Sequence, residues 1–322
     1  MSSDRGPQAA SIPIEHHTSR IRNPATPYLV LLGGVLMAAS ASIMIRQAQR
    51  LGVPSPAIAA GRLGIAVIIL LPIALLRAGS ELRGLPRRDV LLGIGSGALL
   101  AIHFDAWIVS LEHTSVASSV ALVATNPLWI ALAAVLLFRE RLATATWLGA
   151  LVTVAGSAII AVSDGGAADG GNALLGDGLA LLGALAMSGY ILIGRELQRR
   201  LSTLAYIWLV YSSAAVFLTI VALVAGYAGR VAARPPLPAY PPLAYLLVLG
   251  LAVGPQLLGH TAFNWSLRHL SATFVAVAIL GEPIGSALLA LVIFGQGFRP
   301  LQLVGFVILL AGILLAARGE RT

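Results

Sequence analysis

The sequence contains no cysteine and very little charge. Without cysteine the chain can form neither disulfide bonds nor zinc-thiolate sites, and it has no thiol nucleophile. Only 11% of its 322 residues are charged, against about a quarter in soluble domains. Hydrophobic residues make up 58% of the chain and the mean hydropathy is +0.89, so water is not the main solvent of this protein.

Lysine is absent too, and all 21 basic residues are arginine. They stand in short clusters between apolar segments, whereas a nucleic-acid-binding protein gathers its positive charge on one face or tail. We therefore expect no nucleic-acid partner. The sequence also lacks a Walker loop, a metal-binding histidine spacing and a nucleophile elbow. We expect no enzyme activity, no cofactor and no metal site.

Ten apolar segments follow one another along the chain. Each is close to the roughly 20 residues that a helix needs to cross about 30 Å of hydrocarbon. Lipid offers the backbone no hydrogen-bond partner, so each segment must be helical. The predicted fold class is an all-α membrane protein with ten transmembrane helices. They are expected at residues 28–45, 56–76, 90–111, 114–138, 142–162, 176–193, 203–227, 243–265, 271–294 and 300–317.

Arginine is distributed unevenly between the two sides of the membrane. With the N-terminus inside, the inner segments hold 15 Arg and the outer segments five, which assigns the Arg-rich side to the cytoplasm. We expect two cytoplasmic tails, residues 1–26 and 318–322, and a flexible outer linker at residues 163–175. The first tail lacks a signal-peptide pattern, so the expected location is a bacterial-type plasma (inner) membrane, spanned many times.

The chain contains an internal repeat. Residues 106–161 align without a gap on residues 262–317, with a shift of 156 and 14 identities in 56 positions. The matches include SLEHTS on SLRHLS, and Pro127 on Pro283. Because each copy contains five helices, an odd number, the two copies must cross the membrane in opposite directions. Such inverted repeats are typical of carriers that work by alternating access around a midplane site.

Each copy resembles the EamA-type domain of the drug/metabolite transporter superfamily. The resemblance lies in the short turn before the fourth helix, the proline within that helix and a last helix with Gly and then Ala-Gly. The stretch IRQAQRLGVPSPAIAAGRLGIAV, which contains Arg62, resembles the first half of the family. Gln296 departs from the family's Glu, present here as Glu140. The resemblance implies two repeats, residues 27–162 and 176–317, that form an exporter-like carrier of small metabolites.

A few polar side chains fall inside the apolar segments. A charge in hydrocarbon costs roughly 3 kcal/mol or more, so such residues usually face a partner or a cavity. Neutral polar residues and one tryptophan accompany them near the same depths. The candidate transport path consists of Arg62, His103, Asp105, Asn126, Trp129, Gln256, His260 and Glu282.

Arg62 and Asp105 lie at a similar depth on consecutive helices, roughly 9 Å below the outer surface at a rise of 1.5 Å per residue. They are therefore predicted to pair. One interpretation is a structural ion pair between the second and third helices. The other is a direct contact with the substrate or an outer gate.

Glu282 and its repeat counterpart Asn126 lie near the membrane midplane, and each precedes a proline that interrupts the helical hydrogen bonds. Glu282 is interpreted either as a proton carrier or as a packing residue. Trp129, three residues after Asn126, either lines a pocket or fills space. The motifs at residues 250–254 and 281–285, GLAVG and GEPIG, are predicted to bring helices close together.

Gln256, His260 and Asn264 recur at every fourth residue, which places them on one face of the eighth helix. We interpret this face as the wall of a polar entry path, with interhelical hydrogen bonding as the alternative. His103 stands alone on an apolar helix, where a hydrogen-bonded packing role competes with a functional one.

The expected function is export of a small metabolite, an amino acid or a relative, by alternating access. Arg62 would meet a carboxylate, Glu282 an ammonium group and Trp129 an apolar side chain. The alternatives are a multidrug exporter of lipophilic cations and an intramembrane enzyme acting on lipid-linked substrates. Besides the substrate, the expected partners are the lipid bilayer and, if transport is coupled, protons; a monomer suffices for this mechanism.

Overall fold

The computed structural model describes residues 24–113, 119, 122–123, 125–137, 139, 141–163, 172–227, 240–294 and 299–320. Within these ranges the regular structure is helical and contains no strand. The elements are α1 (Thr26–Ala39), α2 (Ala41–Arg50), α3 (Ser55–Arg77), α4 (Gly79–Arg83), α5 (Arg87–His113), α7 (Asn126–Leu136), α8 (Thr144–Ser163), α9 (Ala173–Gln198), α10 (Thr203–Tyr227), α11 (Pro242–Leu251), the π-helix η2 (Ala252–His260), α12 (Thr261–Ser266), α13 (Ala272–Ile279), α14 (Glu282–Phe294) and α15 (Pro300–Glu320).

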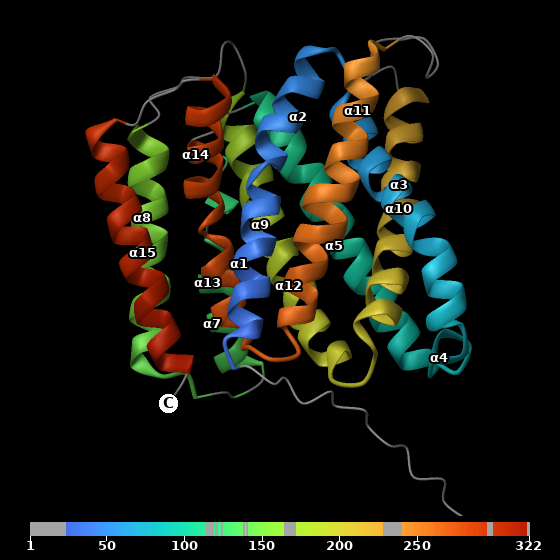
Figure 1. The fold of residues 1–322 in the computed structure, drawn as a ribbon, viewed down its shortest axis with the longest axis horizontal. Coiled ribbons are helices and arrows are strands. Elements are labelled where there is room, and N and C mark those ends of the chain that lie inside the picture. Colours follow the sequence, from blue (N-terminus) through green and yellow to red (C-terminus); the bar gives the residue numbers. More distant parts are fainter. Residues whose placement is uncertain are drawn as a thin grey trace, which may run out of the picture.

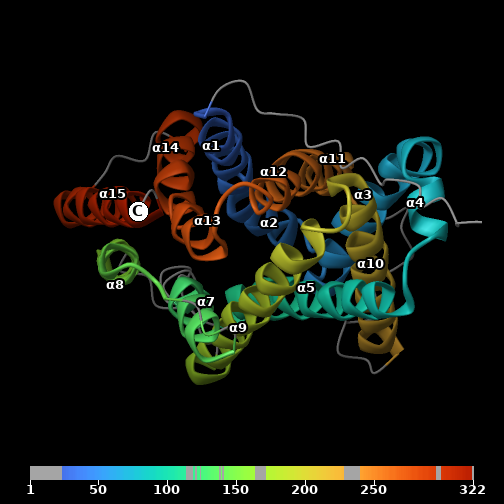
Figure 2. The ribbon, with the colours of Figure 1, turned by 90° about the horizontal axis from the view of Figure 1, so that it is seen from below.

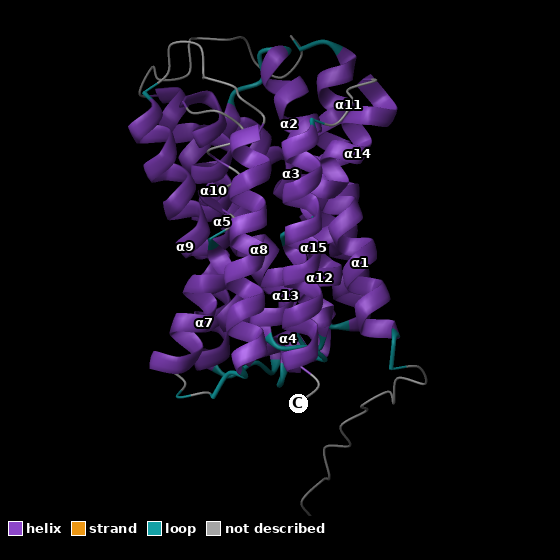
Figure 3. Cartoon of the chain, turned by 90° about the vertical axis from the view of Figure 1, so that its left-hand side faces the viewer, coloured by secondary structure: helices purple, strands orange, loops and turns teal. Residues whose placement is uncertain are grey.

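These helices run between two faces of the molecule (Figure 1). The start of α1 and the end of α15 lie at the same face, as Figures 1 and 3 both show. Six helical stretches are each long and apolar enough to cross a membrane, and apolar side chains such as Leu76 point outward, 85% exposed. In the described residues the ten crossings are α1–α2, α3, α5, α7, α8, α9, α10, α11–η2–α12, α13–α14 and α15. The predicted all-α fold of ten transmembrane helices is confirmed.

The packing of α8 against α15 displays the inverted repeat directly. These two helices stand together at one end of the molecule (Figure 2). A Cβ atom added at Gly156 would lie 2.9 Å from the carbonyl oxygen of Gly305, and one at Gly312 would lie 2.9 Å from that of Gly149. Each contact becomes the other when 156 is added to one number and subtracted from the other. The two last helices are therefore related by the same duplication as the sequence, and only glycine allows this approach.

The fourth helix of each repeat is interrupted at the same place. Where α7 begins, Leu128 N–H donates to the Thr125 carbonyl (3.0 Å), and where α14 begins, Ile284 N–H donates to the Gly281 carbonyl (3.1 Å). Both are tight turns that span three residues instead of four. The residue that opens the new helix, Asn126 or Glu282, stands directly before a proline. The proline accounts for the interruption, because it lacks the N–H that would continue the helix.

A second equivalent feature joins the first three helices of each repeat. Gln49 at the end of α2 donates its side-chain amide to the Ser55 hydroxyl (2.9 Å) and to the Ile108 carbonyl (3.2 Å). Gln198 at the end of α9 donates to the Asn264 carbonyl (2.9 Å) and accepts from the Thr203 hydroxyl (3.3 Å). Ile108 and Asn264 are again 156 residues apart. We call these two arrangements the glutamine clasps.

The small-residue motifs behave differently from one another. Gly281 and Gly285 approach α1 closely, since a Cβ atom at Gly285 would lie 2.6 Å from Ala39 Cβ. This close packing was predicted. Gly254, in the other motif, has no heavy atom within 4 Å of the position of a Cβ atom. The predicted packing role of Gly254 is therefore wrong, whereas a Cβ atom at Gly250 in the same motif would lie 3.3 Å from Met44 Sδ of α2.

Candidate functional site

Arg62 is the buried charge around which the site is built. It lies in α3 with 1% of its surface exposed, and the central carbon of its guanidinium group lies 4.0 Å from the ring centroid of Phe104 in α5. None of its three nitrogens has a hydrogen-bond partner among the described residues. The ring face stabilises the cation by roughly 2 kcal/mol when both are desolvated, which leaves the N–H groups at the edge of the guanidinium plane unsatisfied.

The predicted ion pair between Arg62 and Asp105 is absent. Neither the Arg62 nitrogens nor Asp105 Oδ1 has a partner, and the carboxylate that interacts electrostatically with Asp105 belongs to Glu112 on the same helix. Depth along the membrane normal was predicted for both residues, but rotation about the helix axis was not. Successive residues of an α-helix point about 100° apart. Phe104 faces Arg62, so Asp105 points to another side of α5, where it is only partly buried.

His103 is held by ordinary packing interactions. Its Nδ1 donates to the Gly183 carbonyl of α9 over 2.9 Å, and its ring stacks on Trp107 with an interplanar angle of 11°. These contacts fit the packing interpretation of His103, although its ring also interacts electrostatically with Arg62. On the same helix, the ring of Phe104 meets the ring of His260 edge-on, with 5.1 Å between centroids.

The predicted polar face of the eighth crossing divides into two parts. Gln256 and His260 belong to η2, and both are buried. Neither amide atom of Gln256 has a hydrogen-bond partner, and Nδ1 of His260 has none either. Asn264, one turn further, accepts from the Tyr190 hydroxyl (2.7 Å) and donates to the Tyr211 hydroxyl (3.3 Å). Asn264 is thus interhelical glue, whereas Gln256 and His260 carry free hydrogen-bonding capacity.

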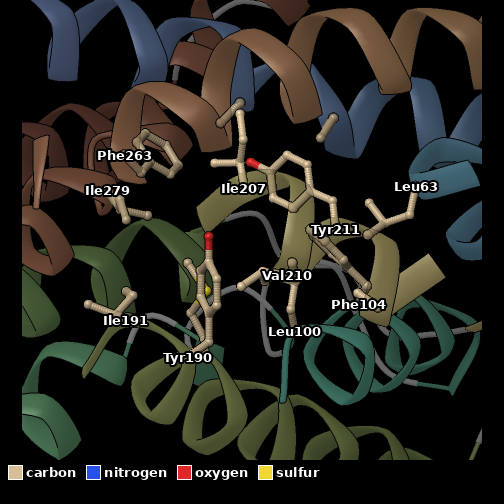
Figure 4. Packing of buried hydrophobic residues seen from close by; sticks show 14 of the residues in the cluster. Leu63, Leu100, Phe104, Tyr190, Ile191, Ile207, Val210, Tyr211, Phe263 and Ile279 are labelled. Atoms are coloured by element: carbon tan, nitrogen blue, oxygen red, sulfur yellow. The ribbon is translucent and has the colours of Figure 1, made fainter. Parts of the chain in front are cut away.

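The two tyrosines come from the sixth and seventh crossings. Figure 4 shows their hydroxyl ends directed from α9 and α10 into the same interior region. Tyr211 lies within electrostatic reach of Arg62 and beside Gln256, although the Gln256 amide does not meet the hydroxyl in hydrogen-bond geometry. Tyr211 therefore connects the bonded part of the network to the unsatisfied part.

The local structure of the eighth crossing explains why Gln256 and His260 face inward together. Pro255 lies inside η2, where the backbone follows the wider π-helical path. Such turns are rare and frequent at functional sites. Helix η2 packs against α1 and α3, and α3 carries Arg62. We call the group Arg62, Phe104, Tyr211, Gln256 and His260 the central cluster.

The interrupted fourth helices carry the remaining predicted site residues. Glu282 is half-buried as the first residue of α14, and its charge interacts with that of Arg62 without forming an ion pair. Asn126 is 2% exposed and its Oδ1 has no partner, while its carbonyl accepts from the Ser188 hydroxyl (3.2 Å). Trp129 donates its indole N–H to the Thr125 hydroxyl (3.0 Å), and no contact joins it to Arg62 or Glu282.

Phe104 and the two buried tyrosines were missed by the sequence analysis. An available signal was the position of Tyr211, well inside a predicted span instead of at the membrane interface where tyrosines collect. Chemically, the central cluster can bind and orient a polar molecule by hydrogen bonds and charge. The described residues contain no group of three His, Asp or Glu side chains that could hold a metal ion.

Comparison with known proteins agrees with this architecture. One solved structure, titled only "Crystal structure of protein", has the same fold with a TM-score of 0.74 and 18% identity, covering 93% of this chain and 100% of its own. No curated protein matches the chain. The model of the EamA-like transporter family matches residues 25–162 and again residues 174–318. The chain therefore belongs to the EamA-like transporter family, whose members move small molecules across membranes.

Proposed function

We propose that this protein is a secondary transporter that exports amino acids or close relatives by alternating access of its two repeats. One observation carries the proposal. Arg62 from the first repeat and Glu282 from the second interact electrostatically in the membrane interior, yet they form no ion pair and the guanidinium has no hydrogen-bond partner. Two opposite charges held apart in hydrocarbon suit a ligand that brings a charge of each sign.

A zwitterion would satisfy both groups. Its carboxylate can accept two hydrogen bonds from the guanidinium fork, and its ammonium group can pair with Glu282. Both charges are then compensated, which removes the cost of keeping them alone at membrane depth. The interrupted helices support the same reading, because discontinuous helices near the midplane are where many carriers bind substrate.

The alternative substrate class, lipophilic cations, suits the central cluster less well. Glu282 could act as a counter-charge, but Arg62 is fully buried and uncompensated within electrostatic reach of it. A cation that approached Glu282 would be repelled by the guanidinium. Resistance of expressing cells to cationic dyes that is lost in Glu282→Gln would nevertheless favour the cation exporter over the amino acid carrier.

We also propose that both termini lie in the cytoplasm of a bacterial-type inner membrane. Because the chain has no cysteine, single introduced cysteines report orientation without background. We expect Asn172→Cys, at the start of α9, to react with a membrane-impermeant maleimide in intact cells. Gly84→Cys, in the turn after α4, should react only after the cells are opened, and the reverse pattern would invert the proposed topology.

Reconstitution tests the function itself. We expect purified protein in proteoliposomes to exchange at least one of the twenty amino acids across the bilayer in a counterflow assay, and protein-free liposomes to exchange none. A proton gradient should alter the rate in the wild type and have no effect in Glu282→Gln if Glu282 carries a proton. If none of the twenty amino acids moves under either gradient direction, the proposal fails.

A further inference from the structure

We infer that Arg62, Gln256 and His260 form a subsite for a single carboxylate, and that this subsite, contributed by both repeats, selects the substrate. The inference rests on the proposed function and adds to it the group of the substrate that is recognised, together with two residues of η2 that recognise it. We call these three residues the carboxylate subsite.

Arg62 is buried without a hydrogen-bond acceptor. The guanidinium group lies over the face of the Phe104 ring, with 4.0 Å between its central carbon and the ring centroid. Its three nitrogens, which carry five N–H donors, have no hydrogen-bond acceptor among the described residues. A buried ion normally has a partner, because isolation costs several kcal/mol even after relaxation. A buried arginine that lies over an aromatic ring and has no hydrogen-bond acceptor can receive one from a ligand.

Two side chains of η2, Gln256 and His260, also have buried atoms without hydrogen-bond partners. The rings of His260 and Phe104 form a T-shaped pair with 5.1 Å between centroids, and the Phe104 ring also lies under the Arg62 guanidinium. Gln256 precedes His260 by four residues in η2 and lies beside Tyr211, which is itself within electrostatic reach of Arg62. Helix α3 packs against η2. His260 interacts electrostatically with Arg62, and Gln256 and Arg62 both interact with Tyr211. The amide of Gln256 and Nδ1 of His260 have no partner of their own among the described residues.

Asn264, in the same crossing, differs from Gln256 and His260 in its hydrogen bonding. Asn264 lies one turn from His260, is equally buried, and has both ends of its side-chain amide hydrogen-bonded. The fold can therefore satisfy a polar side chain on this face of the eighth crossing. Ser266 Oγ at the end of α12 has no partner either, but only Gln256 and His260 lie in the part of the crossing near Arg62, where a ligand could supply the missing partners.

The composition of the subsite indicates a carboxylate. Arg62 supplies one positive charge, and the other two residues supply uncharged hydrogen-bonding groups, so the charges balance for a monoanion. A phosphate monoester carries between one and two negative charges near neutral pH and usually meets several cations. A cation would be repelled. The planar guanidinium fork also matches the two oxygens of a carboxylate in one plane.

The test compares ligands that differ only at this group. Purified wild-type protein in detergent is mixed with each of the twenty amino acids, with their methyl esters, and with propionate and benzoate, which lack an ammonium group. The shift of the thermal unfolding midpoint measures binding. We expect free acids to stabilise the protein and the esters to bind at least about tenfold more weakly, because the ester loses the charged acceptor of the hydrogen bonds.

Three variants locate the effect. Arg62→Gln, Gln256→Leu and His260→Phe should each lose the preference for acid over ester. Arg46→Gln is the matched control, since Arg46 lies in α2 and interacts with Arg50, away from the subsite, and it should keep the wild-type preference. Size-exclusion profiles and the midpoint without ligand show whether each variant is folded. If one is not, Gln256→Glu replaces it, because a carboxylate beside Arg62 should block the subsite while it keeps the shape.

The outcomes separate the two proposals. Equal binding of acid and ester, no carboxylate binding by folded wild-type protein, or an unchanged preference in Arg62→Gln would each overturn the subsite, and amino acid counterflow could still support the proposed function. Conversely, binding of carboxylates that depends on Arg62, together with no amino acid movement in proteoliposomes, would support the subsite and overturn amino acid export.

Discussion

The two repeats share their scaffold and differ in their chemistry. Equivalent glycines bring α8 and α15 together, equivalent turns interrupt the fourth helices, and equivalent glutamines clasp the first three helices of each half. The polar groups of the central cluster have no such counterparts. With the shift of 156, Gln256 corresponds to Leu100 and His260 to Phe104.

Arg62 shows the same asymmetry. It is the eighth residue of α3, and the eighth residue of α10, the corresponding helix of the second repeat, is Val210. Asn126 and Glu282 occupy equivalent places before their prolines but differ in charge. The two repeats thus share the residues that form the helix contacts. A substrate with chemically different ends needs different side chains from each repeat, so the candidate binding residues are those at which the repeats differ.

The largest effect is expected from a change in the central cluster, where the two repeats differ. Arg62→Gln should lower the apparent affinity for transported substrate by about a hundredfold, since a hydrogen-bonded charge contributes roughly 2 to 3 kcal/mol. Thermal stability without substrate should stay the same or rise, because the variant removes an uncompensated charge from the membrane interior. Counterflow kinetics and thermal unfolding measure the two effects. A marked loss of stability would instead assign Arg62 a structural role.

The next effect concerns the shared scaffold. Gly156→Ala and Gly312→Ala should each destabilise the protein by about 1 to 3 kcal/mol, the usual cost of overpacking, because a Cβ atom at either position would meet backbone of the facing helix at 2.9 Å or less. The two losses should be equal within error if the repeats are truly equivalent. Gly254→Ala, where nothing lies within 4 Å, is the control and should be neutral. Unequal losses would break the equivalence.

The glutamine clasps should give a smaller and again matched effect. Gln49→Leu and Gln198→Leu each remove two side-chain hydrogen bonds, worth about 0.6 kcal/mol each between membrane helices, so each variant should lose about 1 kcal/mol. Gln47→Leu, two residues before Gln49 in α2, is the control because Gln47 is partly buried like Gln49 but lies outside the clasp. Thermal unfolding of the three variants is the measurement. An effect of Gln47→Leu equal to that of Gln49→Leu would show that the clasp contributes nothing.

The glutamine clasps explain why hydropathy predicts some helix ends correctly and places others too early. Hydropathy correctly predicts that the third crossing covers residues 90–111, which lie within α5. It ends the first and sixth helices at residues 45 and 193, because the polar stretches RQAQR and GRELQ follow. The structure continues both helices to Arg50 and Gln198, since their polar ends are satisfied by the clasps. Hydropathy measures solvent preference and does not detect a hydrogen bond to a helix far away in the sequence.

The site was predicted in depth and composition but not in arrangement. Every residue of the carboxylate subsite was a candidate from sequence, because polar side chains in apolar segments are few. The sequence does not reveal the rotation of each helix about its axis, nor the π-helical stretch that contains Gln256 and His260. It therefore paired Arg62 with Asp105 at equal depth and overlooked Phe104, an apolar residue next in the chain.

The smallest effect is expected at Asp105, where the two interpretations of Arg62 diverge most clearly. If the two residues formed a structural pair, Asp105→Asn would leave the buried Arg62 alone and destabilise the protein by several kcal/mol. In the structure Arg62 is already alone, so Asp105→Asn should change stability by no more than about 0.5 kcal/mol. For the same reason the double variant Arg62→Gln with Asp105→Asn should be as inactive as Arg62→Gln itself. Membrane yield, thermal unfolding and counterflow of the single and double variants measure this, and wild-type transport in the double variant would show that Arg62 serves only to balance Asp105.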